Sequence, residues 1–241
     1  MGKYIKLFEK DEDYLAFKGT SDFILPNVSH CIEENDVHYN PIPDPFNGHA
    51  YVDLGLPSGT KWATMNVGAE KATDYGLFFA WGETQGYADV STKTFSWSDY
   101  KFNPSGDGYN STDGKTVLDL EDDAASVIWG GKWHMPTKEQ CDELLNTEYV
   151  TNTWVTDYNG SGVKGCLFTS VKNGNTMFIP AAGSCIDGGV NLVGVSGYVW
   201  SSVLYSERSD GAWFFYFNSG ITDVGADGYR FYGQSVRGVV G

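Results

Sequence analysis

The chain has 241 residues, of which 16 are Lys or Arg and 31 are Asp or Glu, so its formal net charge is −15 at pH 7. Because the basic residues are scattered singly, no basic stripe is left for the phosphates of a nucleic acid or of an anionic membrane surface. Aromatic residues make up 15% of the chain and Gly contributes 30 residues, which favours a loop-rich globular fold of one large domain, alone or with a small appendage.

The first 40 residues predict a short appendage. Tyr4 to Phe8 alternate as in a strand, and Phe23 to Val28 form a second short apolar run. This stretch is too small for a core of its own, and docking or oligomerisation is a role that it can have. It lacks the features of a secretory signal, and no apolar run in the chain approaches the roughly 20 residues of a membrane span. We therefore expect cytoplasmic synthesis and no membrane insertion.

Three alternating prolines mark the next boundary. Pro41, Pro43 and Pro45 impose an extended, non-helical connector. We assign residues 1–40 to the N-terminal segment, residues 41–48 to a Pro-rich linker and residues 49–241 to the main domain.

Two helices are predicted in the main domain. The first runs from Leu120 to Trp129, with Glu121, Asp122 and Asp123 in its first turn and Gly130-Gly131 as its stop. The second begins after Pro136. Thr137 and Gln140 have capping-box spacing there, and an apolar stripe follows, made of Cys141, Leu144 and Leu145.

The rest of the chain predicts short strands. These are Cys166 to Ser170, Thr176 to Pro180, Tyr198 to Ser202, Ala212 to Phe217 and Ser235 to Val239. Helices followed by strands predict an α+β domain with mainly antiparallel pairing.

Several ordered motifs resemble a known family. Tyr51 to Gly68, Gly76 to Glu83 and Gly131 to Thr137 resemble the FISUMP-type major paralogous domain of gut bacteria and their phages. That family belongs to the C-type-lectin-like superfamily, in the branch that also holds the formylglycine-generating enzymes. The resemblance implies a C-type-lectin-like fold for residues 49–241. It also places Trp62, Trp133, Trp200 and Trp213 in framework motifs, so we expect these four side chains to be buried.

The C-terminal motifs resemble the variable proteins of diversity-generating retroelements. They are Gly197 to Ser202, Ala212-Trp213, Phe217 to Gly220 and Gly233 to Arg237. In that family, adenines of a template are randomised during reverse transcription, which implies a variable region at about 188–232. The ending Ser235-Val-Arg-Gly238 departs from the usual Ser-Val-Arg-Pro, and this puts the last turn in doubt.

Alternation along Trp213 to Phe217 suggests which side chains face the ligand. We assign Trp213, Phe215 and Phe217 to the core, which leaves Phe214 and Tyr216 outward. A strand buried on both sides is the alternative. The segment from Ile221 to Tyr232 has neither helical nor strand periodicity and predicts a shaped surface loop.

Tyr, Asp, Ser and Gly together are typical of paratopes, although an ordinary solvated loop has a similar composition. The predicted ligand-binding residues are Val199, Val203, Tyr205, Arg208, Ser209, Asp210, Phe214, Tyr216, Asp223, Asp227, Tyr229, Phe231 and Tyr232. The predicted function is ligand or receptor binding, as in a phage tail-tip protein or an adhesin. The expected partner is a protein or glycan on a cell surface, homo-oligomers remain open, and the expected location is a phage virion or a cell surface.

We predict no catalytic residue, metal or cofactor. No Cys follows Cys185, the four cysteines form no CxxC pair, and the four histidines are isolated. Calcium could bind the acidic side chains, but solvation and helix-dipole stabilisation explain them equally well. These side chains are Glu83, Asp119, Glu121, Asp122 and Asp123. The alternative function is a formylglycine-generating-enzyme-like enzyme with an unknown substrate.

Overall fold

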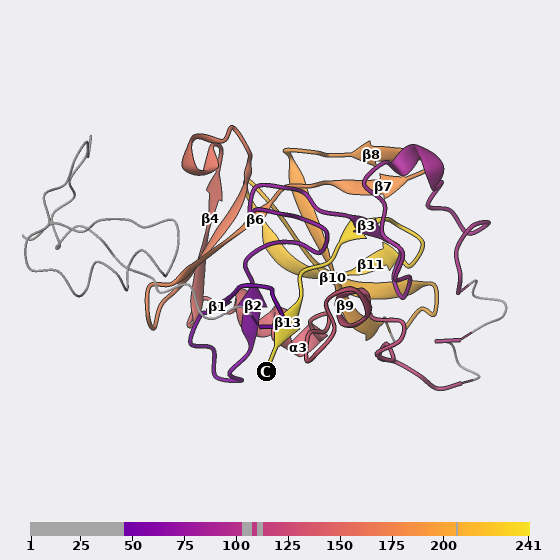
Figure 1. Ribbon diagram of the computed structural model, residues 1–241, viewed down its shortest axis with the longest axis horizontal. Helices are drawn as coiled ribbons and strands as arrows, with labels where there is room; N and C mark the ends of the chain where they lie inside the picture. Colours follow the sequence, from indigo (N-terminus) through magenta and orange to yellow (C-terminus); the bar gives the residue numbers. More distant parts are fainter. Residues whose placement is uncertain (1–45, 103–107, 110–112, 206) are drawn as a thin grey trace, which may run out of the picture. The chain divides into compact units, whose positions relative to one another are not determined.

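The computed structural model describes residues 46–102, 108–109, 113–205 and 207–241 (Figure 1). The predicted N-terminal segment and residues 41–45 of the predicted linker lie outside the described residues. The described residues form an α+β fold of mostly antiparallel strands with two α-helices, α2 (Ala124–Trp129) and α3 (Lys138–Leu145). The predicted class is confirmed at this level. The predicted order is wrong, because three strands precede the helices: β1 (Tyr51–Asp53), β2 (Lys61–Ala63) and β3 (Phe78–Phe79).

The central sheet has five strands in the order β11-β10-β9-β12-β3. Its long members are β9 (Ser196–Leu204), β10 (Gly211–Asn218) and β11 (Thr222–Tyr229), and its short inner strand is β12 (Gln234–Ser235). All its pairings are antiparallel except that between β12 and β9. The segment that predicted a loop from Ile221 is therefore mostly a strand. The Gly and Asp residues of β11 break the apolar alternation that predicts a strand. The ring of Phe214, from β10, packs against two of these glycines.

Three smaller sheets surround the central one (Figure 1). The first joins β1 and β2 to β13 (Val239–Val240). The second contains β4 (Val150–Val155), β5 (Gly165–Ser170) and β6 (Thr176–Pro180), and the third pairs β7 (Ser184–Ile186) with β8 (Gly189–Asn191). Short 3-10 helices span Val90–Thr92 and Tyr158–Gly160. The predicted strands at β5, β6, β9 and β10 are confirmed, whereas the last predicted strand is divided between β12 and β13.

The helix boundaries follow their capping residues. Thr137 and Gln140 form the predicted capping box at the start of α3. The start of α2 was predicted too early. Asp123 is its N-cap and accepts a hydrogen bond from the Ser126 amide at 2.9 Å, so Glu121 and Asp122 precede the helix.

The central sheet is buried on both faces. Phe215 and Phe217, each 0% exposed, pack in one core with Trp62 and Phe168. On the opposite face, Trp200 and Phe214 pack in a second core. Phe214 is only 8% exposed, so its predicted outward position is wrong and the strand is buried on both sides.

Two glycines of β11 explain how Phe214 is accommodated. A Cβ at Gly225 or Gly228 would lie 2.9 Å from the ring of Phe214, so only glycine leaves room for that ring. A bulge between Ala212 and Phe214 shifts the register at the same point. Sequence alternation could not reveal this arrangement, since it depends on the neighbouring strand.

Three of the four framework tryptophans are buried as predicted. Trp62, Trp133 and Trp200 are at most 1% exposed. Trp213 is half-buried, which contradicts the prediction. It lies at the bulge, where its ring meets Tyr205 at 5.0 Å and Lys138 Nζ at 4.7 Å.

The glycine at position 238 has a steric basis. A Cβ at Gly238 would lie 2.6 Å from the ring of Trp129 and 3.1 Å from that of Trp133. Any larger residue at this position would therefore displace one of two packed indoles.

Candidate functional site

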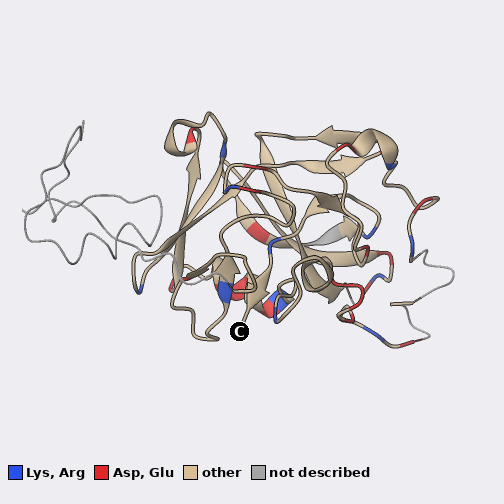
Figure 2. Cartoon of the chain, in the orientation of Figure 1, with Lys and Arg blue, Asp and Glu red and all other residues tan. Residues whose placement is uncertain are grey.

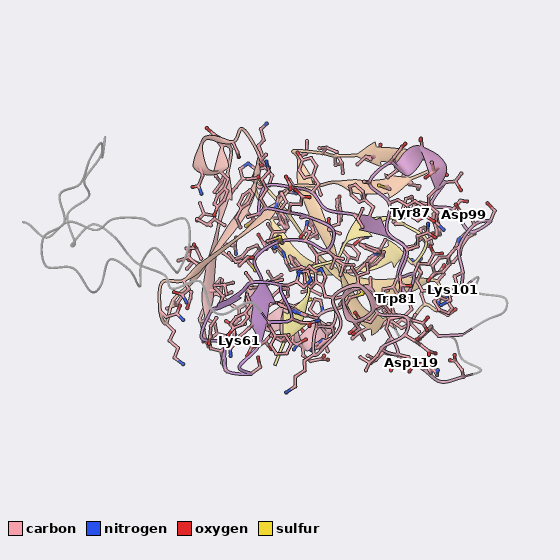
Figure 3. All side chains as sticks on the ribbon, viewed as in Figure 1. Lys61, Trp81, Tyr87, Asp99, Lys101 and Asp119 are labelled. Carbon is pink, nitrogen blue, oxygen red and sulfur yellow. The ribbon has the colours of Figure 1, made fainter. Side chains whose placement is uncertain are left out.

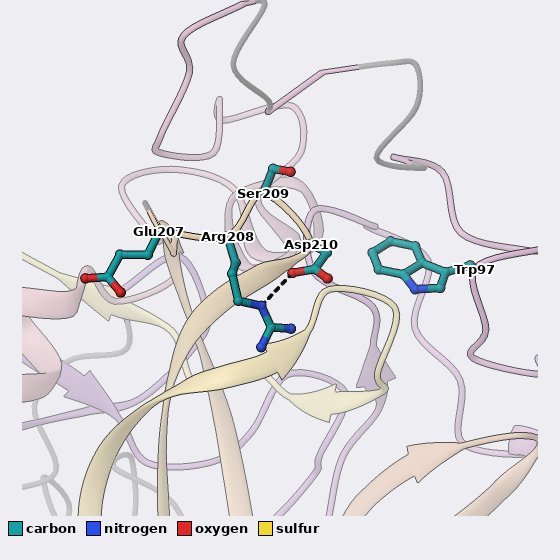
Figure 4. Close-up of a pocket in the computed structure, with 5 residues that line it drawn as sticks. All are labelled: Trp97, Glu207, Arg208, Ser209 and Asp210. Atoms are coloured by element: carbon teal, nitrogen blue, oxygen red, sulfur yellow. Dashed lines mark hydrogen bonds and ion pairs between the residues drawn. The ribbon is translucent and has the colours of Figure 1, made fainter.

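A surface pocket lies where the β9–β10 turn meets the loop that carries Trp97. It is lined by Trp97, Glu207, Arg208, Ser209 and Asp210 and has a volume of about 410 Å³. Figure 4 shows Trp97 and Asp210 facing each other across it, while Glu207 extends on the other side of the turn. We call this feature the Trp97 pocket.

Contacts along the turn fix its polar side chains. The Arg208 amide donates to the carbonyl of Tyr205 at 3.3 Å, and the Arg230 amide donates to the carbonyl of Asp210 at 3.0 Å. Arg208 Nε donates to Asp210 Oδ1 at 2.9 Å, and its guanidinium lies 5.1 Å from the ring centre of Tyr229. The turn therefore holds a cation over an aromatic ring beside the pocket.

The Trp97 loop is organised around the carboxylate of Asp99. This carboxylate accepts hydrogen bonds from the amides of Thr94 and Ser96, both at 2.9 Å, and from the Thr94 hydroxyl at 2.6 Å. Partial burial acts to raise the pKa of Asp99, but these hydrogen bonds and the charge of Lys93 outweigh it, so the pKa is lowered. Asp99 is thus ionised at neutral pH and fixes the loop that presents Trp97.

A buried ion pair supports the same loop from below. Lys93 Nζ lies 2.9 Å from Glu83 Oε2 and donates to the carbonyl of Asp99 at 2.6 Å. The amide of Lys101 donates to Glu83 Oε1 at 2.8 Å. In Figure 3, Tyr87, Asp99 and Lys101 lie toward one end of the molecule, away from Lys61. Glu83, one of the acidic residues considered for calcium, is therefore used inside the scaffold.

Aromatic rings form the floor beside the pocket. The ring of Trp97 lies 4.8 Å from that of Phe231, 5.6 Å from that of Tyr100 and 6.3 Å from that of Tyr229, all in edge-on geometry. Tyr100 is anchored by its hydroxyl, which donates to the carbonyl of Trp81 at 2.6 Å. Edge-on packing of this kind stabilises an aromatic cluster and restricts the ring of Trp97.

The fully buried Arg230 lies beneath the floor. Its guanidinium donates to the carbonyls of Tyr109 at 3.1 Å and Phe102 at 3.0 Å. It also lies 5.6 Å from the ring centre of Tyr100. Desolvation lowers its pKa, and the nearby aromatic rings and carbonyls compensate part of the cost of burying its charge.

The structure brings part of the predicted binding set together at this pocket. Arg208, Ser209 and Asp210 line it, Tyr229 and Phe231 contact Trp97, and the Tyr232 ring lies 4.9 Å from that of Phe231. Phe231 is only 9% exposed, so it supports the floor and offers little surface.

Other predicted residues lie elsewhere on the sheet. Tyr216 is paired in register with Tyr198 on one side and Asp223 on the other, and the two Tyr rings are stacked 6.1 Å apart. Tyr205 packs on Trp213, and Val203 is half-buried and paired with Val117. These residues form separate surface patches.

Two predicted binding residues are interior ones. Val199 is 1% exposed and packs with Phe215, and Phe214 fills the opposite core, so neither side chain is available to a ligand. Asp227 lies in β11, and its side chain is outside the described part of the chain. Alternation in sequence could not separate these residues from surface ones in a sheet covered on both sides.

The sequence interpretation missed Trp97, Glu207 and Tyr198. Trp97 comes from a polar loop more than 100 residues before the turn that it faces. Its one sequence signal is a single indole between serines, in Ser96-Trp97-Ser98-Asp99, where a large apolar side chain has no obvious core to join.

The acidic residues near α2 are paired with cations. The carboxylates of Asp119, Glu121 and Asp122 lie within 4.8 Å of one another. Asp122 contacts Lys101 and accepts from the Tyr109 hydroxyl at 2.8 Å, and Asp119 forms an ion pair with Lys115. Two of the three carboxylates therefore already have a lysine partner, and Asp123 caps α2.

The described cysteines and histidines have structural surroundings. Cys141, Cys166 and Cys185 are free and buried, and desolvation raises the pKa of Cys166 and of Cys185 to about 12. Such thiols are protonated at neutral pH and are poor nucleophiles. His49 stacks on Trp129 at 4.3 Å, and desolvation lowers its pKa. His30, His38 and Cys31 lie outside the described residues.

Comparison of the chain with protein-family models, with curated proteins and with solved structures finds no match. Among the described residues, no helix has both the length and the apolar character to cross a membrane. Lys and Arg positions are spread singly over the ribbon and form no continuous stripe in the view of Figure 2. The function has to be argued from the geometry of the site.

Proposed function

We propose that this chain is a ligand- or receptor-binding protein that presents a diversified surface on a C-type-lectin-like scaffold. The binding face is centred on the Trp97 pocket, and the role is recognition, not catalysis. The receptor is a protein or glycan on a cell surface, reached from a phage particle or from another cell.

One observation carries the proposal. The polar residues Arg208, Ser209 and Asp210 line a pocket with a half-buried Trp, on a turn between two strands whose interiors are packed on both faces. A concave site with an aromatic wall and a few fixed polar groups is typical of ligand recognition. A rigid sheet beneath such a turn lets the side chains at the turn change while the fold is kept.

The surroundings of the pocket also support recognition. Asp99 and the buried pair of Lys93 and Glu83 hold the Trp97 loop in place without a ligand. A preformed site loses little conformational entropy when it binds, which increases affinity. The motifs that resemble variable proteins of diversity-generating retroelements cover β9, β10 and β12, the strands that lead into and support this turn.

The structure narrows the proposed binding face. At and beside the pocket, this face contains the partly or fully exposed residues Arg208, Ser209, Asp210, Tyr229 and Tyr232, together with Trp97 and Glu207. The separate surface patches of Val203, Tyr205, Tyr216 and Asp223 extend it along the sheet. Phe214 and Phe231 lie in the core beneath it, and Val199 lies in the core on the other side of the sheet. For a formylglycine-generating-enzyme-like activity, no contact among the described residues offers specific support.

A library experiment tests the proposal. Arg208, Ser209, Asp210 and Tyr232 are randomised in the full chain, displayed and selected against a panel of cell-surface proteins and glycans. We expect different members to select different targets, while single changes at Ser209 and Tyr232 alter the free energy of unfolding by less than about 1 kcal/mol. A matched library at Phe215 and Phe217 is the control and should yield few folded members.

Two results would count against this function. One is a face library whose folded members all keep the same target or bind none. The other is genomic. Diversification requires a near-copy of the coding sequence for Gly188 to Arg237, differing almost only at adenines, beside a reverse transcriptase gene. If the genome has no such near-copy, the claim of diversification is wrong. The binding face is then tested by the library experiment alone.

A further inference from the structure

We propose that the group entering the Trp97 pocket is a cation, supplied as an Arg or Lys side chain by a protein partner. The inference rests on the proposed binding role and names the chemistry of the ligand. It depends on three features of the pocket: its charge, the surroundings of its indole ring and the second carboxylate oxygen of Asp210, which accepts no hydrogen bond from the described residues.

The charge of the pocket and of the chain favours a cation. Two of the five lining residues, Glu207 and Asp210, are acidic and one, Arg208, is basic. The whole chain carries a formal charge of −15, so its long-range field attracts cationic partners and repels anionic ones. A neutral sugar would gain nothing from this field.

Trp97 offers the best aromatic partner for a cation. Among the aromatic side chains, indole gives the strongest cation–π attraction. The ring is half-buried, with edge-on neighbours in Phe231, Tyr100 and Tyr229 that leave it in a fixed orientation. On the same floor, Arg208 already lies 5.1 Å from the ring centre of Tyr229, so this surface accepts a guanidinium over an aromatic ring.

Asp210 supplies the second half of the site. Its Oδ1 accepts from Arg208 Nε at 2.9 Å, and among the described residues its Oδ2 accepts no hydrogen bond. Figure 4 shows this carboxylate between Arg208 and Trp97. An ammonium or guanidinium bound to Asp210 would meet a carboxylate oxygen with the indole of Trp97 beside it, a combination that neither an anion nor a sugar hydroxyl uses fully.

Charge complementarity also indicates the kind of partner. The pocket lies at the surface between a turn and the loop of Trp97. Tyr229 contacts the rings of Trp97 and Tyr232, and such partly exposed aromatic side chains suit a protein interface. Arg in particular is enriched at the energetic centres of such interfaces, where it stacks on aromatic rings. The occupant we infer is thus a basic side chain that projects from a folded partner.

Single-charge probes test the inference on the full chain. The probes are Ac-Gly-Arg-Gly-NH2, Ac-Gly-Lys-Gly-NH2, the uncharged citrulline analogue of the first, and methyl glucoside, each titrated at physiological salt. The readout is the NMR signal of the Trp97 indole N–H, assigned by its loss in Trp97→Phe. We expect the Arg and Lys probes to shift this signal and the two neutral probes to leave it unchanged.

Two matched variants separate the pocket from the overall charge. Asp210→Asn should weaken binding of the Arg probe by about fivefold, because it removes the local carboxylate. Glu148→Gln makes the same change of charge at an exposed site in the α3–β4 connection and should weaken it less than about twofold. Amide spectra of both variants establish that the fold is intact.

The possible failures are distinct. If the citrulline or glucoside probe shifts Trp97 as strongly as the Arg probe, the cation inference is overturned and the binding function stands. If no probe shifts Trp97, or if Glu148→Gln weakens binding as much as Asp210→Asn, the inference is also overturned. The proposed function then depends on the library experiment alone, which uses none of these probes.

Discussion

The centre of the β9–β10 hairpin and its turn differ in how much of the molecule covers them. At the centre, Phe215 and Phe217 are fully buried on one face and Phe214 and Trp200 are buried on the other. At the turn, Arg208 and Asp210 are only partly buried, Ser209 is exposed, and a loop distant in sequence adds Trp97. Two neighbouring segments of one hairpin therefore have different roles.

Exposure in this sheet is decided by the segments that pack against each side chain and not by alternation along the strand. Phe214 and Tyr216 point to the same face of β10, yet Phe214 lies under the glycines of β11, whereas Tyr216 lies beside Tyr198 and Asp223 and stays partly exposed. In the described part of this hairpin, side chains are accessible where that cover ends. If burial decides the roles of these side chains, substitutions at the buried hairpin centre should lower the free energy of unfolding more than substitutions at the exposed turn.

The largest expected effect is at the hairpin centre. Phe215→Ala should lower the free energy of unfolding by about 3–5 kcal/mol, and Phe214→Ala by about 3 kcal/mol, because each leaves a cavity in a packed core. Chemical denaturation measures both. Tyr216→Ala is the control on the same face and should cost less, since its side chain is partly exposed. A cost at Phe214 below about 0.5 kcal/mol would show that this side chain does not belong to the core.

A smaller effect is expected at a buried cation that joins two sheets. Arg237 donates to the carbonyls of Ala63, in β2, at 3.2 Å and of Phe178, in β6, at 2.8 Å. Desolvation lowers its pKa to about 9, which still leaves the side chain charged at neutral pH. The two carbonyls stabilise this charge by accepting its hydrogen bonds. Arg237→Lys cannot reproduce the two-armed contact and should cost about 2–3 kcal/mol in denaturant unfolding.

Arg208→Lys at the turn is the matched control for that variant. It makes the same exchange at a half-buried position and should cost less than about 1 kcal/mol. Equal costs at Arg237 and Arg208 would remove the distinction between the scaffold and the turn.

The smallest effect concerns the loop of Trp97 and depends on pH. The pKa of Asp99 is lowered in the folded state, so its contribution to stability is complete above the unfolded value near 4 and is lost as the pH falls through the folded value. We expect hydrogen exchange at the amides of Thr94 and Ser96 to lose protection on acidification below about pH 4, before that of Phe215 does.

Asp99→Asn provides the control for this pH dependence. The variant should show weak protection of the Thr94 and Ser96 amides at neutral pH and little further loss on acidification. Unchanged protection in the variant would mean that the carboxylate does not hold the loop.

Local sequence determined the elements whose stabilising contacts are close in the chain. The capping box of Thr137 and Gln140 was readable because its partners are three residues apart, and β5, β6, β9 and β10 were readable from apolar runs bounded by turns. The same reasoning placed the start of α2 too early, because the acids Glu121 and Asp122 resemble a first helical turn, and only the structure shows that Asp123 is the cap.

The candidate site was only half readable. Arg208, Ser209 and Asp210 could be proposed from the composition of one turn, but Trp97 joins them from a separate loop. No sequence spacing encodes that meeting. Asp99, Lys93 and Glu83 fix the shape of the loop, and ring contacts with Tyr229 and Phe231 hold Trp97 beside the end of β11.

The sequence by itself determined the α+β class, the polar and aromatic character of the C-terminal region and the negative net charge, since each follows from residue type and short-range order. Tertiary structure alone decided which aromatic side chains are core and which are surface. The physical reason is that burial depends on what packs against each face. Phe214 is interior because Gly225 and Gly228 of β11 leave room for its ring, and Trp97 lines a pocket because the β9–β10 turn lies opposite it.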